Sequence, residues 1–232
     1  MIEERVPPSQ AGAGSPAPVI DTARNQREYR RISRIYDGLA VPWLTTGLRR
    51  EAVARLRLRP GDSVMDLGCG TGLTLAVLAE VVGPKGRVVG VDLSPDQLAR
   101  ANDRIRAAGW QNVHLVPANA EELDLGEQFD GIISTYTHDI MTSPLAVERA
   151  VAHLKPDGGF VAMGFKRPTG WGAPLNAVFV AFYRLFRIPV NWEAETSSRP
   201  WTHLERHLAS VKAGERFLGT WYRAVGVKPS GE

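Results

Sequence analysis

The sequence has one cysteine, few lysines and no long apolar run, and each scarcity excludes a class of protein. Cys69 is the only cysteine among 232 residues, which excludes a disulfide framework and any metal site built from clustered cysteines. No stretch reaches the roughly 18 uncharged apolar residues that a membrane span requires. The first residues lack the basic-then-apolar order of a signal peptide. We therefore expect a cytoplasmic protein without disulfides.

The net charge of +3 is unevenly distributed along the chain. Residues 1–60 hold 11 Arg and 6 acidic residues, so the remainder is slightly acidic. No nucleic-acid-binding motif accompanies this basic part, and we expect no nucleic-acid partner. A basic N-terminal face suits either a solvated helix surface or a peripheral contact with anionic lipid or an acidic partner. The sequence leaves monomer and homodimer open.

Hydrophobic residues at 44% and charged residues at 23% are typical of one globular domain with additions. Residues 1–20 consist mainly of Pro, Gly, Ala and Ser, which predicts a flexible tail. The rest, 21–228, is expected to form a single domain. Within it we expect cap helices in 21–60, and a lid insertion followed by a last helix in 166–211.

Short apolar runs alternate with helical segments from residue 63 onward. The expected strands are Ser63–Leu67, Arg87–Asp92, Val113–Pro117, Phe129–Thr135 and Gly159–Phe165, followed by a hairpin of Glu215–Leu218 and Trp221–Val227. The expected helices begin near Thr22, Leu44 (to Leu58), Gly72 (to Val82), Pro95 (to Ala108), Pro144 (to Leu154), Leu175 (to Arg187) and Trp201 (to Val211). Such alternation is typical of βαβ units, and hence of an α/β fold whose parallel sheet is covered on both faces.

The segment VMDLGCGTG (64–72) runs from the first strand of this series into a helix. Glycines at 68, 70 and 72 allow a tight turn and a close backbone approach to a ligand at the carboxyl end of that strand. Their G-x-G-x-G spacing differs from the G-x-G-x-x-G of dinucleotide binding. Asp66 beside the loop suits a cationic amino group better than a pyrophosphate.

Two later strand ends supply further ligand-binding groups. Asp92 ends the second strand, where a carboxylate can accept from both ribose hydroxyls. Asn119-Ala120 follows the third strand, where a side-chain carbonyl can accept from an adenine amino group. An amino group, a ribose diol and an adenine together describe S-adenosylmethionine.

On these residues the chain resembles the class I S-adenosylmethionine-dependent methyltransferases, and among them the ubiquinone/menaquinone-biosynthesis type and related small-molecule enzymes. The matching stretches are VMDLGCGTG (64–72), VVGVDLSPDQLARA (88–101), NVHLVPANAEELDL (112–125), FDGIIST (129–135) and LKPDGGFVAMGF (154–165). The resemblance implies a Rossmann-like three-layer sandwich with a seven-stranded, mostly parallel sheet whose last strand is antiparallel. N-terminal helices and an inserted helical lid would complete it.

The resemblance also implies roles for individual residues toward S-adenosylmethionine, whose product is S-adenosylhomocysteine. Asp66 and Gly68 would hold the methionine end, and Asp92 the ribose. Leu93 would stack on the adenine, and Asn119 and Ala120 would contact its edge. The rest of the implied cofactor set is Cys69, Gly70, Gly72, Ser134, Thr135 and Tyr36, with Cys69 expected to be a small packing residue.

Methyl transfer from a sulfonium is an in-line displacement, so the protein mainly positions the reactants and excludes water. A base is needed only when the acceptor loses a proton. The candidates for this base are His138, Tyr136 and Tyr36. His138 is favoured because the pKa of histidine suits neutral pH. The alternative is that His138 is a loop residue without a catalytic role. His203 and His207 have the spacing of a helical pair, but no third ligand motif accompanies them, and we expect no metal.

Aromatic residues after the fifth strand predict the character of the acceptor. The candidate pocket residues are Tyr29, Trp171, Phe179, Phe182, Trp192 and Trp201. They suit an apolar small molecule, or they pack the lid against the sheet. We therefore expect methyl transfer to an O, C or N atom of a quinone-, polyketide- or other specialised-metabolite-like acceptor. The alternatives are a phospholipid N-methyltransferase and a protein that uses the bound cofactor as a scaffold for another reaction.

Overall fold

The structure, a computed structural model, describes residues 41–167 and 199–231 together with Pro174, Ala177 and Ala181. The predicted tail at 1–20 and the helix beginning near Thr22 lie outside these residues. The inserted helix predicted at 175–187 does too, apart from Ala177 and Ala181.

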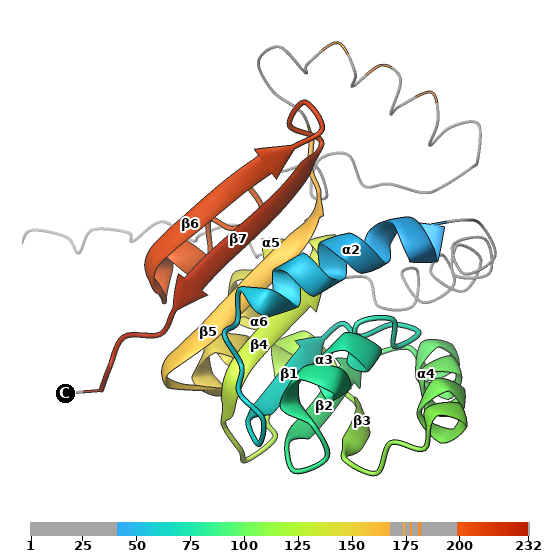
Figure 1. Cartoon of the computed structure of the whole chain (residues 1–232). Helices are drawn as coiled ribbons and strands as arrows, with labels where there is room; N and C mark the ends of the chain where they lie inside the picture. Colours follow the sequence, from blue (N-terminus) through green and yellow to red (C-terminus); the bar gives the residue numbers. More distant parts are fainter. Residues whose placement is uncertain (1–40, 168–173, 175–176, 178–180, 182–198, 232) are drawn as a thin grey trace, which may run out of the picture.

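Seven strands form one sheet in the order β3-β2-β1-β4-β5-β7-β6 (Figure 1). Their bounds are β1 Ser63–Leu67, β2 Arg87–Asp92, β3 Val113–Pro117, β4 Phe129–Thr135, β5 Leu154–Phe165, β6 Ala209–Arg216 and β7 Trp221–Val227. β7 is antiparallel to both of its neighbours, β5 and β6. The pairs β1–β2, β1–β4, β2–β3 and β4–β5 are parallel. The expected sheet, with its antiparallel last strand, is confirmed.

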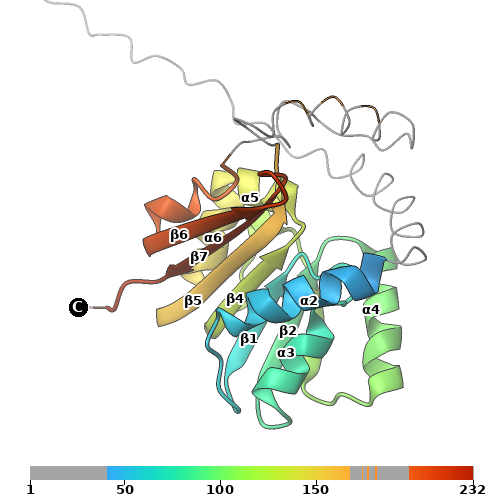
Figure 2. The same ribbon diagram turned by 45° about the horizontal axis from the view of Figure 1, so that its top comes forward.

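The side chains of successive strand residues point alternately into two apolar cores, one on each face of the sheet. On one face pack α2 (Val41–Ala54), α3 (Leu75–Val82) and α4 (Pro95–Ala108), against strand residues such as Val64 and Ile133. On the other pack η1 (Ala120–Glu122), α5 (His138–Thr142), α6 (Pro144–Ala152) and η3 (Leu204–Arg206), against residues such as Met65 and Ile132. Figure 2 shows α2 and α3 on one side of the sheet and α5 and α6 on the other. This is the expected three-layer arrangement.

The first four predicted strands and the helix Pro95–Ala108 match the structure at both ends. α3 begins at Leu75 rather than Gly72, because Gly72 has a left-handed φ of 82° that a helix cannot contain. β5 begins five residues earlier than predicted, at Leu154, and α6 ends at Ala152. α2 starts at Val41, so Pro42 lies in its first turn, where a missing N–H costs nothing.

The predicted helix Trp201–Val211 is wrong. Only η3 is helical there, and β6 begins at Ala209 instead of at Glu215. Trp201, Leu204 and Leu208 are indeed buried, which explains the helical spacing of the apolar residues. The backbone after Leu208 nevertheless pairs with β7, and this non-local ladder overrides the local pattern.

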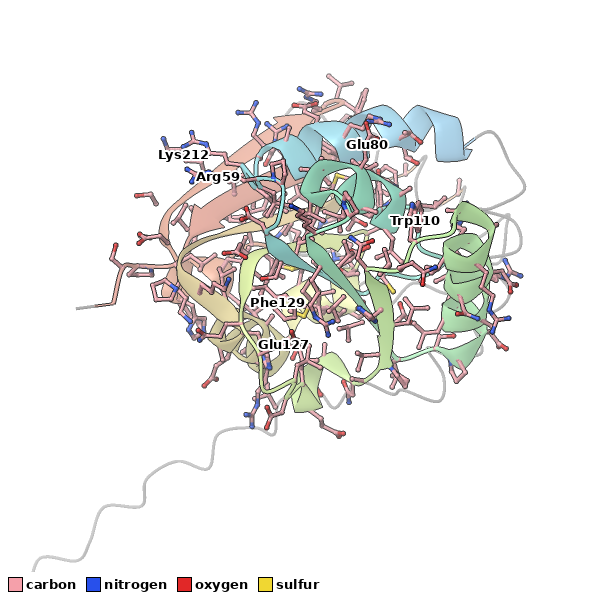
Figure 3. The ribbon with its side chains drawn as sticks, turned by 60° about the horizontal axis from the view of Figure 1, so that its bottom comes forward. Arg59, Glu80, Trp110, Glu127, Phe129 and Lys212 are labelled. Atoms are coloured by element: carbon pink, nitrogen blue, oxygen red, sulfur yellow. The ribbon has the colours of Figure 1, made fainter. Side chains whose placement is uncertain are left out.

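The amino-terminal edge of the sheet is held by ion pairs. Asp130 of β4 accepts from the Ser63 backbone at 2.8 Å and from Lys155 Nζ at 2.9 Å. Arg87 pairs with Glu127 at 3.1 Å. Figure 3 shows this edge, with Glu127 and Phe129 at the start of β4. These contacts hold together the strand starts, at the edge of the sheet opposite the glycine loop. Among the described residues, every helix is too short or too polar to traverse a lipid bilayer.

Candidate functional site

The glycine loop between β1 and α3 is held by the neighbouring strand β2. The backbone N–H groups of Gly68 and Cys69 both donate to the Val91 carbonyl, at 2.8 and 2.9 Å. Gly68 has a φ of 73°, and a Cβ there would lie 2.3 Å from Cγ2 of Thr137. Gly70 has a φ of 54°, but a Cβ there would meet no atom of the described residues within 4 Å. Gly68 is thus required by packing, whereas Gly70 presents bare backbone to open space that a ligand can enter.

Asp92, at the end of β2, is bound to the glycine loop through its carboxylate. One oxygen accepts from the Gly70 N–H at 2.8 Å and the other from the Ser94 N–H at 2.8 Å. Burial raises the pKa of Asp92, and these backbone N–H groups oppose that rise. The Leu93 backbone contributes in the same sense. A carboxylate has about four acceptor positions, so Asp92 can still accept from a ribose hydroxyl.

Asp66 is a fully buried carboxylate without a hydrogen-bond donor in the described structure. Neither of its oxygens has a partner there. The pKa of Asp66 is raised to about 7: burial is the largest cause, the Arg49 charge opposes the rise and the Asp92 charge adds to it. A buried charge without a partner is costly, so the site favours a cationic group that would supply one. This orphan carboxylate beside a bare Gly70 fits the aminoacyl end of S-adenosylmethionine.

Arg49 of α2 is a site residue that the sequence analysis did not identify. Its Nη1 donates to Oγ1 of Thr74 at 2.7 Å and to Oγ1 of Thr135 at 2.8 Å. Its guanidinium lies 5.1 Å from the ring centroid of Tyr136. One cation therefore joins α2, the start of α3 and the end of β4, and it lies close enough to affect the titration of Asp66.

The sequence alone does not separate Arg49 from the adjacent Arg50. Arg49 follows Thr45 by one helical turn, and Thr45 is buried, whereas the adjacent Arg50 is exposed and pairs with Glu80 at 2.8 Å. An arginine on the apolar stripe of an amphipathic helix needs buried polar partners. The two adjacent arginines look alike in the sequence, and only the packing of α2 on the sheet separates them.

The end of β4 and the turn after it bring several predicted residues together. The Ser134 hydroxyl donates to the Leu67 carbonyl at 2.9 Å and lies 2.5 Å from Oγ1 of Thr137. Tyr136 has a left-handed φ of 61°, unusual for an aromatic residue, and its ring lies 5.3 Å from that of Phe165. Strained backbone of this kind occurs often at functional sites. The turn aims Tyr136 across the ends of β4 and β5.

His138 and Asp139 begin the short helix α5, directly after this turn. Burial lowers the pKa of His138, and a hydrogen bond with the Phe165 backbone opposes that shift. Its Nδ1 has no partner among the described residues. Burial raises the pKa of Asp139, and the Asp92 charge contributes to the rise. A neutral imidazole with an unused nitrogen is chemically able to accept a proton here.

Asn119 and Leu93 lie at the adjacent strand ends. Asn119 Oδ1 accepts from the Glu121 N–H at 3.1 Å and so caps η1, in which Ala120 is buried. Leu93, between Asp92 and Ser94, is partly exposed. Both residues lie near the carboxyl end of β2, because the Ala118 N–H donates to the Asp92 carbonyl at 3.2 Å.

The buried Cys69 behaves as a packing residue. A Cβ at Gly90 would lie 3.0 Å from its Sγ, so the glycine in β2 makes room for the thiol. Burial raises the pKa of that thiol, which keeps it protonated and unreactive.

The remaining predicted residues fall into two groups. Trp201 is 5% exposed, and its ring lies 5.5 Å from that of Tyr222 in the core on the α6 face. His203 and His207 flank η3, and no metal-binding cluster occurs within the described ranges. The others, Tyr29, Tyr36, Trp171, Phe179, Phe182 and Trp192, lie outside the described residues.

Comparisons with known proteins agree with this geometry. A family described as "Methyltransferase domain" matches residues 64–158. The chain is 29% identical over 167 residues to a demethylmenaquinone methyltransferase of Symbiobacterium thermophilum. The aligned region covers 68% of this chain and 66% of the relative. It is 30% identical over 162 residues to the ubiquinone/menaquinone biosynthesis C-methyltransferase UbiE of Vibrio cholerae, covering 64% of this chain and 62% of that protein. The chain thus spans less than two thirds of either relative.

Solved structures share the fold. A SAM-dependent methyltransferase from Aquifex aeolicus superposes with a TM-score of 0.59 at 18% identity, over 78% of this chain and 89% of the other. The residues matched by the family, 64–158, contain the glycine loop, Asp92, Asn119 and His138.

Proposed function

We propose that this chain, as a class I S-adenosylmethionine-dependent methyltransferase, transfers the methyl group of that cofactor to a hydrophobic small molecule of the quinone type. The observation that carries the proposal is the pairing of Asp66 with Asp92 around Gly70. One carboxylate is buried without a donor, and the other is held by two backbone N–H groups with lone pairs to spare. An ammonium group and a ribose diol would satisfy both.

Each end of the cofactor would meet a different part of the site. Asp66 would accept from the ammonium group, and the positive charge of Arg49, which already acts on Asp66, would favour the cofactor's carboxylate. Asp92 would accept from the ribose hydroxyls. Asn119 and Leu93 would contact the adenine. When bound, the cofactor supplies an electrophilic methyl group on a sulfonium.

The residues of this chain would contribute mainly orientation and exclusion of water. Tyr136, its ring against Phe165 and under the Arg49 cation, would form the wall between cofactor and acceptor. His138 is the base that we assign for an acceptor that loses a proton, because burial keeps its imidazole neutral near physiological pH. The pocket assigned to Tyr29, Trp171, Phe179, Phe182 and Trp192 stays a prediction.

Two relatives support a quinone-type acceptor, since their names assign them to demethylmenaquinone and to ubiquinone/menaquinone biosynthesis. Their alignments cover only part of their length, and the acceptor therefore needs a direct test. The purified chain is incubated with S-adenosylmethionine and, in parallel, a demethylated naphthoquinol, a flavonoid and phosphatidylethanolamine. Product is followed as S-adenosylhomocysteine and as a mass increase of one methyl group.

The expected result is turnover of the quinol and none of phosphatidylethanolamine. Turnover of the phospholipid alone would replace the proposed acceptor class with a lipid headgroup. Cofactor binding measured by calorimetry, with NAD as the competing dinucleotide, tests the site separately from the acceptor. Binding of NAD in preference to S-adenosylmethionine would contradict the proposal.

A further inference from the structure

The hairpin between β6 and β7 ends in two large apolar residues that the fold does not use. Phe217 is 63% exposed and Leu218 is 69% exposed, the highest values among the exposed large hydrophobic residues of the described chain. Neither residue belongs to either core cluster. Burial therefore does not explain why apolar side chains stand here.

The same two residues strain the turn. Phe217 has a φ of 53° and Leu218 a φ of 57°, both left-handed and followed by Gly219 at 79°. Bulky side chains adopt this conformation at an energetic cost that Asn or Gly would avoid. Neither the backbone conformation nor the solvent exposure of this turn favours Phe and Leu. Residues that are unfavourable in both respects are often found at functional positions.

The turn is nevertheless well formed and firmly attached. Thr220 is buried, its hydroxyl donates to the Phe217 carbonyl at 2.9 Å, and its own carbonyl accepts from the Lys166 N–H at 2.9 Å. Trp221, directly after the turn, pairs with Phe165 at the end of β5 and is buried. The apolar tip is thus held on a rigid base rather than on a fraying end.

This base stands at the ligand-binding edge of the sheet. Phe165, whose strand pairs with the start of β7, contacts the Tyr136 ring next to His138. Figure 1 shows the β6–β7 turn at the same end of the molecule as the end of β5. A surface that docks on the tip would lie beside the site.

Cations outnumber acidic residues around the base of the tip. Arg216 directly precedes the tip and Arg167 follows the residue that bonds to Thr220, and both are exposed; Arg223 is half-buried, Lys166 is buried, and Lys212 lies further along β6, opposite Val225. The acidic residues that pair with these cations are Glu215, which pairs with Lys166, and Glu51, which pairs with both Arg216 and Arg223. Exposed apolar side chains within a net positive surround are typical of proteins that insert into the interface of an anionic membrane.

We propose that the tip formed by Phe217 and Leu218 inserts into the surface of an anionic lipid bilayer, with the neighbouring cations against the headgroups. The inference rests on the proposed function in one respect: an acceptor dissolved in lipid would then lie next to Tyr136 and His138. Insertion would give both exposed side chains an apolar environment and so offset the cost of the left-handed turn.

Co-sedimentation of the full chain with vesicles tests the proposal without cofactor or acceptor. Vesicles of phosphatidylglycerol mixed with phosphatidylcholine are compared with vesicles of phosphatidylcholine alone. The double variant Phe217→Asn with Leu218→Gly should reduce partition onto the anionic vesicles on the order of ten-fold or more, since both apolar side chains are lost. Its thermal midpoint should stay equal or rise, because the strain is relieved.

Two controls keep the result interpretable. Val227→Thr removes an exposed apolar side chain at the far end of β7, 43% exposed, and should bind vesicles like the wild type. Phe217→Trp with Leu218→Met keeps the tip apolar and should retain binding. Failure of the proposed function would be seen separately: the wild-type chain would bind vesicles but would show no binding of S-adenosylmethionine in calorimetry.

Three outcomes would overturn the inference. The wild type would fail to sediment with anionic vesicles, or the double variant would sediment as the wild type does. In the third, the wild type would form a dimer in analytical ultracentrifugation that the double variant abolishes, which would make the tip a contact between copies of the chain.

Discussion

The Asp92 carboxylate accepts a hydrogen bond from the Gly70 backbone N–H at 2.8 Å, and so joins the end of β2 to the loop after β1. These residues are 22 positions apart in the sequence. The bond orients both the carboxylate and the bare backbone of Gly70 toward the same space.

Removal of this carboxylate should weaken cofactor binding. We expect Asp92→Ala to raise the Kd for S-adenosylmethionine by an amount equal to about 2–3 kcal/mol, because charge-assisted hydrogen bonds to the ribose are lost. Isothermal titration calorimetry measures the change. Asp62→Ala removes a carboxylate that caps a turn at the opposite edge of the sheet and should leave the Kd unaltered. Equal affinity in wild type and Asp92→Ala would exclude β2 from the site.

The two glycines of the loop should respond differently to substitution. Gly70→Val should fold, with a loss of about 1–2 kcal/mol from its left-handed φ, and should block cofactor binding, because its side chain points into open space. Gly68→Ala should cost about 2–4 kcal/mol in the free energy of unfolding, since its Cβ would overlap Thr137. Urea titration and calorimetry separate the two effects. Tight binding by Gly70→Val would show that the loop does not touch the ligand.

Asp66 should make cofactor affinity depend on pH. With a pKa of about 7 in the free protein, this carboxyl is mostly neutral at pH 6 and mostly ionised at pH 8. A cationic ligand binds the ionised form, so affinity should rise about ten-fold between these two pH values. Asp66→Asn should bind weakly and without this dependence. A flat profile in the wild type would contradict the assignment.

The same carboxyl should affect folding stability in the opposite sense. Its pKa is higher in the folded than in the unfolded state, so its contribution is most favourable at low pH and is lost as the pH rises through 7. Asp66→Asn should therefore stabilise the fold at pH 8 by up to about 4 kcal/mol, and much less at pH 5. Urea unfolding at both pH values measures this difference. A destabilised Asp66→Asn at pH 8 would show that the carboxylate has a partner in the folded state.

Arg49 should act on Asp66 as well as on the ligand. Arg49→Met removes the positive charge that lowers the Asp66 pKa, so the midpoint of the pH dependence of binding should move upward. Arg49→Lys keeps the charge but not both hydrogen bonds to Thr74 and Thr135, and the midpoint should stay near that of the wild type. Calorimetry across the pH range gives both midpoints. A merely structural role would alter stability in both variants and leave the midpoint unchanged.

His138 should affect the chemical step and not cofactor binding. For an acceptor that loses a proton, His138→Gln should lower kcat about 10²- to 10⁴-fold, with the Kd for the cofactor unchanged. The wild-type rate should rise with pH and level off below the ordinary histidine pKa, because burial lowers the His138 pKa. The variant should lack this acidic limb. An identical pH–rate profile in both proteins would assign the proton transfer to another group.

The sequence alone determined the first four strands and the residues at their carboxyl ends. Apolar runs bounded by Gly, Pro and Ser carry that information locally, and Ser94-Pro95 marks the start of α4 at the observed residue. Because parallel strands place their carboxyl ends at one edge, Asp66, Gly70 and Asp92 could be assigned to one site before the structure was known. The left-handed φ values at 68, 70 and 72 agree with the choice of glycine at these positions.

Tertiary packing alone decided the remaining features. Residues 209–211 carry a helical pattern, yet pairing with β7 makes them a strand, because a ladder between distant segments satisfies more backbone groups than one further helical turn. Arg49 and Arg50 are equivalent in the sequence, and only the packing of α2 gives Arg49 its buried hydroxyl partners. The pKa of Asp66 near 7 likewise comes from its complete burial, a property of the folded chain around it and not of the motif that contains it.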